Sequence, residues 1–497
     1  MFIGVDIGTS SVKATLADKR GNVIGTASRS YPCSHPRPGW SEQNPEDWYD
    51  AAVSAVREVV VQSGSGPAAV EGISFAGQMH GLVVLDKNDR VIRPAVLWND
   101  GRSVEECSYF NGTIGKQHLI DHCGNIAFPG FTAPKLLWMR AHEPELFKRI
   151  DKLMLPKDYL VYRMTGMFCT DVSDASGTLL FDVRNRVWSR FMVDLVGVDM
   201  RQLPSVRESW EVVGKLSASA AMDCGLPQGV RVSVGAGDNA ASAVGMGCVR
   251  EGQCNISLGT SGTVFIPAQT MPELAGDGLH AFADATGSYH LLGCILSAAS
   301  ANGWWVKNIL ASGFSQEIGK IVPSSFGRNR TFFLPYLMGE RSPINDAGAR
   351  AAFVGMDMDT TRTDMVQAVI EGVTFALRQS FNVAVDAGVR VDDLTLCGGG
   401  AQNDAWCQIV ADVFNMPVRV LDSSGGPGYG ACLLSMVGCG LYPDVKVAAQ
   451  SCVPGPTKLV APDASAAMRY DERYRAFESL YPALRHVFPL VGGAVND

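Results

Sequence analysis

Two segments of the sequence carry the residue types needed to hold a polyphosphate. Residues 4–15 read GVDIGTSSVKAT and residues 254–265 read CNISLGTSGTVF, so each contains an apolar run, Gly-Thr-Ser and a run rich in β-branched residues. The pattern predicts a hairpin whose tip presents backbone N–H groups and hydroxyls in a small space, which suits an anion such as phosphate. Ordinary turn chemistry is the simpler explanation for either tip alone. Two such tips, however, favour one polyphosphate gripped from opposite sides.

Two carboxylates accompany these segments. Asp6 stands where the second hairpin has Ser257, and it is a candidate ligand for Mg²⁺, held directly or through water. Asp238 lies in VGAGDNAAS, where a predicted strand ends and a helix of small residues begins. A carboxylate there would point into a cleft at the carboxyl edge of a sheet, although Asp is also a good helix N-cap. The sequence therefore offers one acid for a metal ion and one for a hydroxyl group.

Polar and aromatic side chains follow two other predicted strands. The segment GQMHG (77–81) places polar atoms between two glycines, and it is either part of a site or a turn with a solvent-facing His80. The segment AVLWNDGRS (95–103) ends an apolar run with Trp98, Asn99, Asp100 and Arg102. An aromatic ring beside hydrogen-bonding side chains suits a polyol or sugar, whose hydroxyls need partners and whose C–H faces need a flat apolar surface. A core tryptophan next to a turn explains the second segment equally well.

A glycine-rich segment, LCGGGAQNDAW (396–406), joins a predicted strand to a helix. Its glycines would let a nucleotide's base and ribose lie on bare backbone. It does not contain GxGxxG, so a dinucleotide-binding fold fits poorly. The sequence also lacks a P-loop, because GFSQEIGKI (313–321) has five residues between its glycines and no Ser or Thr after Lys320.

Composition narrows the function classes. The chain has 497 residues, of which 46% are hydrophobic and 19% charged, which indicates a globular protein of several domains. A formal net charge of −8 argues against a duplex nucleic-acid partner. We expect a cytoplasmic protein without a membrane span, because no segment has about 18 uncharged apolar residues and the start does not resemble a signal peptide. Thirteen cysteines without metal-ligand spacing favour reduced thiols.

Strand and helix patterns alternate along the chain and restart halfway. The first half predicts a hairpin over 2–16, a third strand at 22–28, a helix over 45–62, and strands at 70–77 and 230–237. The second half predicts a hairpin over 252–265, helices near 291–311 and 361–385, a strand at 392–400, and a helix over about 402–415. This alternation predicts two α/β domains of similar plan. We place the domains at 1–245 and 246–497, with a hinge near 245–252.

In its motifs the chain resembles the FGGY carbohydrate kinases, which belong to the wider actin–hexokinase–chaperone ATPase fold. The resemblance covers nearly the whole chain, and AGQMHG with WND-x-R points to the xylulose-specific branch of the family. The segments that carry it are IGVDIGTSSVKA, PGWSEQNPEDWY, AGQMHG, PAVLWNDGRS, PGFTAPKLLW, LPKDYLVYRMTG, DVSDASGT, GAGDNAASAVG, ISLGTSG, FFLPYLMGERSP, AFVGMDMDTTRTDMVQAVIEG and CGGGAQNDAW.

This resemblance implies two actin-like, ribonuclease-H-like ATPase domains around a deep interdomain cleft, with sugar held mainly by the first domain and ATP by the second. It implies ATP-dependent phosphorylation of a ketopentose at its terminal hydroxyl, with Mg²⁺ as cofactor. D-xylulose is the expected substrate, and L-xylulose, ribulose or another ketose or polyol are the alternatives. The family is often dimeric, so a homodimer is compatible with the resemblance, although the sequence contains no recognisable interface pattern.

The motifs also assign expected roles to single residues, with Asp238 as the catalytic base. The expected sugar-binding residues are Gln78, Met79, His80, Trp98, Asp100, Arg102, Asp238 and Asn239. The residues expected to bind ATP are Asp6, Thr9, Ser10, Lys13, Gly259, Thr260, Ser261, Gly399, Gly400 and Asn403, and Asp6 is also the expected metal ligand.

The chain departs from the family pattern at three positions. Pro427 and Tyr429 replace plainer small residues, which could alter the edge of the nucleotide pocket, and Ala141 stands where relatives usually have a polar residue.

Two other functions remain open on the sequence alone. One is a non-catalytic or chaperone-like actin-fold ATPase, which would need the hairpins but not the sugar segments. The other is a dinucleotide-dependent sugar oxidoreductase, which the missing fingerprint disfavours.

Overall fold

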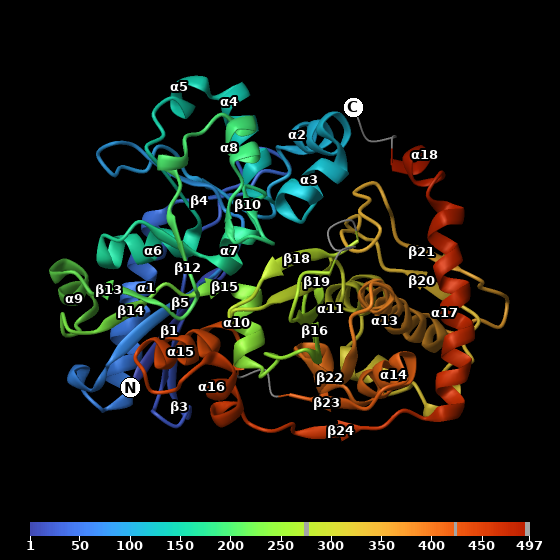
Figure 1. Ribbon diagram of the computed structural model, residues 1–497. Helices are drawn as coiled ribbons and strands as arrows, with labels where there is room; N and C mark the ends of the chain where they lie inside the picture. The colour runs from blue at the N-terminus through green and yellow to red at the C-terminus, as the bar shows by residue number, and fades with distance from the viewer. Residues whose placement is uncertain (273–277, 422–424, 493–497) are drawn as a thin grey trace.

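The computed structural model describes residues 1–272, 278–421 and 425–492, and these residues form two large mixed sheets. Figure 1 shows the two sheets in separate lobes, with helix α10 (Asp238–Gly245) between them. The first sheet has the strand order β13-β14-β5-β1-β2-β3, with β15 beside β5, and the second has the order β18-β19-β17-β16-β22-β23-β24. The predicted fold class is confirmed.

The strands of the first sheet are β1 (Phe2–Ile7), β2 (Ser11–Ala17), β3 (Val23–Ser30), β5 (Gly72–Gly77), β13 (Val212–Lys215), β14 (Arg231–Ser233) and β15 (Ala236–Gly237). Those of the second are β16 (Gly252–Leu258), β17 (Gly262–Ala268), β18 (His280–Ala283), β19 (Tyr289–Ile295), β22 (Val391–Cys397), β23 (Val418–Val420) and β24 (Lys458–Val460). Short pairs are β4 (Glu42–Gln43) with β7 (Ala95–Val96), β6 (Val83–Leu85) with β8 (Lys152–Met154), β9 (Cys169–Asp171) with β12 (Ser205–Arg207), β10 (Phe181–Asp182) with β11 (Val187–Trp188), and β20 (Phe332–Leu334) with β21 (Ala352–Val354).

The helices before the second sheet are α1 (Pro45–Ser63), α2 (Val104–Ser108), α3 (Lys116–Cys123), α4 (Thr132–His142), α5 (Pro144–Phe147), α6 (Pro156–Thr165), α7 (Val172–Ser176), α8 (Arg190–Val196), α9 (Ala218–Cys224) and α10. Those that follow are α11 (Ala299–Trp304), α12 (Phe314–Ile318), α13 (Arg362–Asp386), α14 (Asp404–Phe414), α15 (Pro427–Gly438), α16 (Val445–Cys452), α17 (Ala464–Leu484) and α18 (Phe488–Gly492). No helix of the described ranges is long and apolar enough to cross a membrane.

The repeat seen in the sequence is a repeat of sheet topology. In the first sheet β1 pairs antiparallel with β2 and parallel with β5. In the second sheet β16 pairs antiparallel with β17 and parallel with β22. The registers bring Ile7 opposite Val12 and Leu258 opposite Gly262, so Gly-Thr-Ser forms the tip of each hairpin. The central strand of each sheet therefore ends at a predicted phosphate-binding tip.

Two long helices form where capping residues start an apolar periodicity. Helix α1 begins after Asn44, whose side chain accepts the N–H of Glu46, and Pro45 occupies its first position. Helix α13 begins with a capping box of Thr361 and Asp364. Both predicted helices are confirmed, and each packs on its own sheet: α1 contacts β2 and β3, and α13 contacts β17 and β19.

Two predicted elements differ in the structure. The helix expected near 291–311 is wrong in its first part, because residues 289–295 form β19, which pairs antiparallel with β17. A short apolar run fits a buried strand as well as a helix, and pairing partners decide between them. The strand expected at 230–237 is broken into β14 and β15 by Gly235, whose φ is 85° and whose Cβ would lie 1.9 Å from the Phe75 carbonyl oxygen.

Two helices of the second predicted domain pack against the first one, across the domain boundary that we place between residues 245 and 246. Helices α15 and α16 come from the second half of the sequence, but they lie in the lobe of the first sheet (Figure 1), and α15 packs on β1 and β5. Glycines allow this close approach, since a Cβ on Gly4 would lie 1.9 Å from the Gly428 carbonyl oxygen and one on Gly430 would lie 1.8 Å from that of Ala241. The amino-terminal end of α15 is thereby fixed beside β1 and α10.

The edge strand of the second sheet is docked onto the first half of the chain. The Asn125 side chain donates to the Ala281 carbonyl at 2.8 Å and accepts the Ala281 N–H at 3.0 Å. The Ser176 hydroxyl accepts the N–H of Ala283 at 3.0 Å. These bonds satisfy backbone groups of β18 that an edge strand would otherwise leave unpaired, and they join the two lobes beside the predicted sugar segments.

Candidate functional site

A pocket of about 190 Å³ lies where the two halves of the chain meet. It is lined from the start of α10, from β16, from β17, from the second hairpin tip and from the first turn of α15. The lining residues are Asp238, Asn239, Ser242, Ala243, Asn255, Ser257, Gly259, Ser261, Thr263, Phe265 and Pro427. The predicted catalytic acid and the predicted second phosphate hairpin therefore share one pocket.

Both hairpin tips have backbone donors to offer. In the first tip the Gly8 N–H donates to the Ser11 carbonyl at 3.0 Å. The N–H groups of Thr9 and Ser10, by contrast, have no hydrogen-bond partner in the described part of the chain. The same holds, over the same ranges, for the N–H groups of Thr260 and Ser261. A tip with free, oriented amides is suited to bind phosphate oxygens.

Neighbouring residues hold each tip in place. The Gln43 side chain donates to the Thr9 carbonyl at 2.6 Å, and the Tyr31 hydroxyl donates to the Gly8 carbonyl. In the second tip the Thr260 carbonyl accepts the N–H of Ala298 at 3.0 Å and the Ser300 hydroxyl at 2.6 Å. Because the carbonyls are bound from behind, the N–H groups are turned toward the opposite side.

Two carboxylates lie close together at the edge of this pocket. Burial raises the pKa of Asp238 to about 6, and the Asn239 N–H, which donates to its Oδ1 at 2.7 Å, opposes the rise. Burial and then the charge of Asp238 raise the pKa of Asp6 to about 7, and Lys13, its cross-strand partner, opposes this. A Cβ on Gly428, in the first turn of α15, would lie 3.6 Å from the Asp6 Cβ. The positive end of α15 therefore faces the same place as the two acids.

Asp238 is not an N-cap. Gly237 occupies the N-cap position of α10, and Asp238 is the first helical residue. The Gly237 N–H donates to the Ser173 hydroxyl at 3.0 Å, and that hydroxyl donates to Asp171 Oδ2 at 2.5 Å. Asp171 Oδ1 in turn lies 3.1 Å from the Lys157 ammonium, and all three side chains are fully buried. A rigid polar chain thus fixes the backbone from which the Asp238 carboxylate projects.

The GQMHG segment is also held from behind. His80 has a φ of 69°, and its Nδ1 lies 2.7 Å from the Gly177 carbonyl, so Nδ1 carries the proton and Nε2 is left as an acceptor. Burial, with the charges of Arg341 and Lys135, lowers the pKa of His80 well below its usual range, so the ring is neutral. Gln78 donates to Gln43 at 3.0 Å, and its own Oε1 is buried without a partner among the described residues.

Met79 connects this segment to the catalytic acid. The Asn239 side-chain amide lies 3.7 Å from the Met79 sulfur, and a Cβ on Gly237 would lie 2.9 Å from Met79 Cγ. The predicted sugar pair is therefore next to the start of α10. Trp98 joins the same region, since its indole N–H donates to the Thr9 hydroxyl at 3.0 Å.

Asp100 and Arg102, two further predicted sugar-binding residues, pair with each other. Both side chains are fully buried, and they form an ion pair at 2.7 Å. The Arg102 guanidinium also binds Glu42 at 2.7 Å and stacks on Trp40 at 3.7 Å from the ring centroid. Asp100 accepts the N–H of Ser41 at 2.6 Å. These contacts support the loop that carries Trp98, and the Nη1 group of Arg102 is buried without a partner among the described residues. Sugar binding by Asp100 and Arg102 stays a prediction.

The glycine-rich segment packs on the strand that leads to the second hairpin tip. Gly398 has a φ of 90°, and a Cβ there would lie 2.7 Å from the Leu258 carbonyl oxygen. A Cβ on Gly399 would meet open space, whereas Gly400 packs against Leu258. Asn403 is the N-cap of α14, accepting the Trp406 N–H at 3.0 Å. The open backbone at Gly399 therefore lies next to β16. Adenosine binding by Gly399, Gly400 and Asn403 stays a prediction.

The three departures from the family pattern have different surroundings. Pro427 lines the pocket at the first turn of α15. Tyr429 is buried away from it, and its hydroxyl donates to the Cys452 carbonyl at 2.7 Å. Ala141 is exposed on α4. Of these three residues, Pro427 is the one that lines the pocket.

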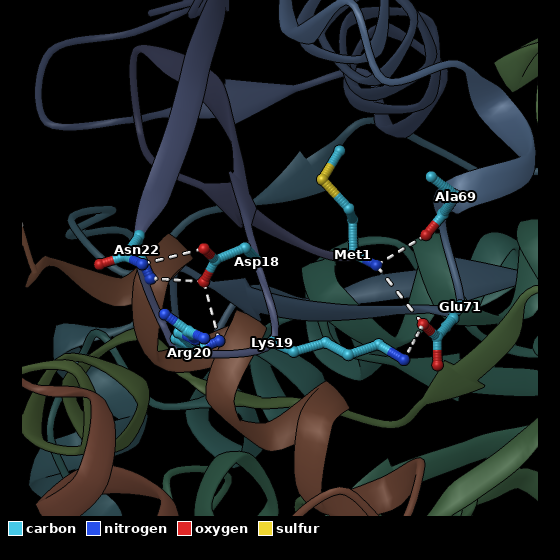
Figure 2. A pocket seen from close by; sticks show the side chains of 7 residues that line it. All are labelled: Met1, Asp18, Lys19, Arg20, Asn22, Ala69 and Glu71. Atoms are coloured by element: carbon cyan, nitrogen blue, oxygen red, sulfur yellow. Dashed lines mark hydrogen bonds and ion pairs between the residues drawn. The ribbon is translucent and has the colours of Figure 1, made fainter.

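A second hollow, of about 480 Å³, lies on the surface near the amino terminus. Figure 2 shows that its polar side chains face one another: Lys19 binds Glu71 at 2.8 Å, and Asn22 donates to Asp18 at 2.9 Å. It contains no predicted site residue, and its two acids, Asp18 and Glu71, are already paired. Its lining residues are Met1, Asp18, Lys19, Arg20, Asn22, Ala69 and Glu71.

Sequence reasoning missed three supporting residues of the main site. Ser173 and Gln43 are ordinary polar residues in the sequence, and only folding brings them to Gly237 and to Thr9. Arg341 lies in FFLPYLMGERSP, which carried the family resemblance, but no role was predicted for it. Its guanidinium lies 6.0 Å from the centre of the Trp98 ring.

Comparison with known proteins agrees with this arrangement. Residues 1–245 match the N-terminal domain of the FGGY family of carbohydrate kinases, and residues 254–439 match its C-terminal domain. The chain is 35% identical to the xylulose kinase of Bacillus subtilis, over 96% of each chain. It is 37% identical to that of Escherichia coli, over 97% of this chain and 99% of the relative.

Solved structures give the same result. A xyloylose kinase from Brucella ovis superposes with a TM-score of 0.91 at 38% identity, over 98% of this chain and 99% of that one. The xylulose kinase of Rhodospirillum rubrum gives 0.90 at 28% identity, over 98% and 99%. With both of its domains matched in order and its whole length aligned, the chain belongs to the FGGY family of carbohydrate kinases.

Proposed function

We propose that the protein transfers the γ-phosphoryl group of ATP to the terminal hydroxyl of D-xylulose, giving D-xylulose 5-phosphate and ADP. The observation that carries this proposal is that Asp238, from the first half of the chain, and Gly259 and Ser261, from the second, line one pocket. A sugar hydroxyl and a triphosphate can meet there while each is held by its own half. The choice of sugar is supported by the relatives from Bacillus subtilis and Escherichia coli, both named xylulose kinases.

In this reaction the terminal oxygen of the sugar bonds to the γ-phosphorus, and the bond from that phosphorus to the β,γ-bridging oxygen breaks. Asp238 orients the hydroxyl and accepts its proton, which general-base catalysis requires. Because burial raises the pKa of Asp238 to about 6, the carboxylate is ionised at neutral pH and still a better base than an ordinary aspartate. The free N–H groups of Thr9, Ser10, Thr260 and Ser261 are suited to the charge on the transferred group.

Asp6 fits a Mg²⁺ ion that is held mainly by phosphate oxygens and water. Mg²⁺ usually takes only one or two protein carboxylates in such sites, and the described ranges hold no group of three or more His, Cys, Asp or Glu residues that could bind a metal. The nearby Asp238 charge contributes to the raised pKa of Asp6, so a cation there would relieve repulsion. When bound with ATP, the ion would neutralise phosphate charge, and Asp6 would hold it directly or through water.

The sugar would lie against the GQMHG segment. His80 Nε2 is available to accept a hydroxyl, Gln78 Oε1 is a buried acceptor, and the Trp98 ring offers a flat apolar face. Asn239 lies between this segment and Asp238. A ketopentose can thus contact the segment along its length while its terminal hydroxyl reaches Asp238.

A panel of sugars with ATP and Mg²⁺, scored for ADP formed, tests the proposal. D-xylulose should give the highest kcat/KM among D-xylulose, L-xylulose, D-ribulose, xylitol and glycerol. A higher value for another member would reassign the substrate. ADP release that no sugar accelerates would favour an actin-fold ATPase that acts as a conformational switch, and a nicotinamide absorbance change with a polyol would favour an oxidoreductase.

A further inference from the structure

The loop that contains Arg341 is firmly attached to the second sheet. Glu340 is buried, and its Oε1 accepts the N–H groups of Leu296 and Arg341, each at 2.8 Å. The Ser342 N–H donates to the Cys294 carbonyl at 3.0 Å. The backbone at Arg341 is therefore fixed to the end of β19, so its side chain is presented from the second half of the chain.

The Arg341 side chain reaches the sugar segments of the first half. Its guanidinium carbon lies 6.0 Å from the centre of the Trp98 ring. A Cβ on Gly130 would lie 3.5 Å from Arg341 Nη2 and 2.4 Å from the Trp98 carbonyl oxygen, so a larger residue would crowd this position. Lys135 donates to the carbonyls of Gly130 and His80 at 2.7 and 2.9 Å and holds both segments together.

The N–H donors of the Arg341 guanidinium are unused among the described residues. Across residues 1–272, 278–421 and 425–492 it makes no hydrogen bond and no ion pair. Arginine carries five N–H donors in a fixed planar fork, and a partly buried set of unused donors is suited to ligand oxygens. Two kinds of oxygen are available at this site: those of the sugar and those of the phosphates.

Charge effects place the guanidinium at the sugar end. Burial is the largest cause of the lowered pKa of His80, and the positive charge of Arg341 is the second largest. The same charge also lowers the pKa of His280. Asp6 and Asp238, the two acids at the phosphoryl-transfer point, behave differently, because the charge of Arg341 shifts neither of their pKa values. Its charge therefore acts on the GQMHG segment and not on the carboxylates next to the phosphate hairpins.

We propose that Arg341 is a sugar-binding residue contributed by the second half of the chain, which donates hydrogen bonds to ketose oxygens between Trp98 and His80. This inference rests on the proposed function, and it adds a donor to a sugar pocket predicted only from first-half residues. Since the side chain comes from the other lobe, a bound sugar would bridge the two halves. Sugar binding would then favour the closed arrangement that excludes water during transfer.

The test compares Arg341→Ala and Arg341→Lys with Arg330→Ala. Arg330 is an exposed arginine in the same half, in a long ion pair of 3.8 Å with Asp357. D-xylulose is titrated by calorimetry without nucleotide, and steady-state KM values are measured for D-xylulose and for ATP. Melting temperatures check that each variant is folded.

Arg341→Ala should weaken D-xylulose binding roughly ten- to hundredfold, the usual effect of losing charge-assisted hydrogen bonds, and raise its KM accordingly. Arg341→Lys should recover part of the affinity, because one point charge replaces the fork. The KM for ATP should change less than about twofold, as should all values for Arg330→Ala.

Unchanged sugar affinity in a folded Arg341→Ala would overturn the inference, and so would a raised KM for ATP with a normal KM for D-xylulose, which would assign the guanidinium to the phosphates. These results differ from failure of the proposed function. In that case wild-type protein itself would neither bind nor phosphorylate D-xylulose.

Discussion

Replacing Asp238 with asparagine should lower turnover and also make the folded protein more stable at alkaline pH. Burial raises the pKa of Asp238 to about 6 from its ordinary 3.8. One pKa unit corresponds to roughly 1.4 kcal/mol, so ionising this carboxyl in the native protein costs up to about 3 kcal/mol. Water in the pocket reduces this cost, and we expect Asp238→Asn to gain about 1–2 kcal/mol at pH 8.

The stability gain has a defined pH dependence. Because the native pKa is higher than the unfolded one, the native protein binds this proton more tightly than the unfolded chain does. The cost of the charged carboxylate therefore appears as pH rises from about 4 to about 6 and is constant above that. The difference in melting temperature between Asp238→Asn and wild type should be largest at pH 8 and should vanish near pH 4.

Kinetics provide the second half of this test. Loss of a positioned base should lower kcat by roughly 10²-fold or more while D-xylulose binding persists. Asp444→Asn is the matched control, because Asp444 is an exposed acid at the start of another helix, α16; it should change turnover less than about twofold. Near-normal kcat in Asp238→Asn, or a melting temperature at pH 8 below that of wild type, would refute the reasoning that a buried charge is kept here for catalysis.

Three further predictions concern the supports of the site. Ser173→Ala should lower kcat about tenfold with little change in KM, whereas Ser209→Ala, which removes another hydroxyl from the same Asp171 oxygen at 2.7 Å without touching Gly237, should not; equal kcat values in the two variants would contradict this. Asp6→Asn should raise the Mg²⁺ concentration for half-maximal rate at least tenfold and leave calorimetric sugar affinity unchanged; an unaltered Mg²⁺ requirement would remove Asp6 as a ligand. Gly177→Ala should raise the KM for sugar and not for ATP, because the new Cβ would lie 2.4 Å from His80 Nδ1; normal sugar kinetics would show that the ring's position is unimportant.

Local patterns were sufficient for the parts of the fold that depend on near neighbours. The twinned hairpins are predictable because glycine at a tip and β-branched residues on either side constrain the same short stretch of backbone. Helices α1 and α13 are predictable for a similar reason, since their caps and apolar periodicity lie within one segment. The run at 289–295 was not, because only pairing with β17 makes it a strand.

The candidate site divides in the same way. Asp6, Asp238 and His80 could be selected from their motifs, but the motif around Asp100 and Arg102 gave no sign that Glu42 and Trp40 would bury both side chains. Residue type states what chemistry a side chain can do. Whether it faces a ligand or a neighbour depends on contacts with distant segments.

The sequence alone determined that this protein has two copies of a strand–Gly-Thr-Ser–strand hairpin, an acid in one copy, and a further acid at the start of a helix of small residues. Tertiary structure decided that one pocket joins the second hairpin to that further acid, that α15 packs on the opposite half of the chain, and that Arg341 reaches the sugar segments. The physical reason is range: backbone conformation follows from adjacent residues, whereas burial, pKa and the pairing of charges are set by residues that are distant in the chain and close in space.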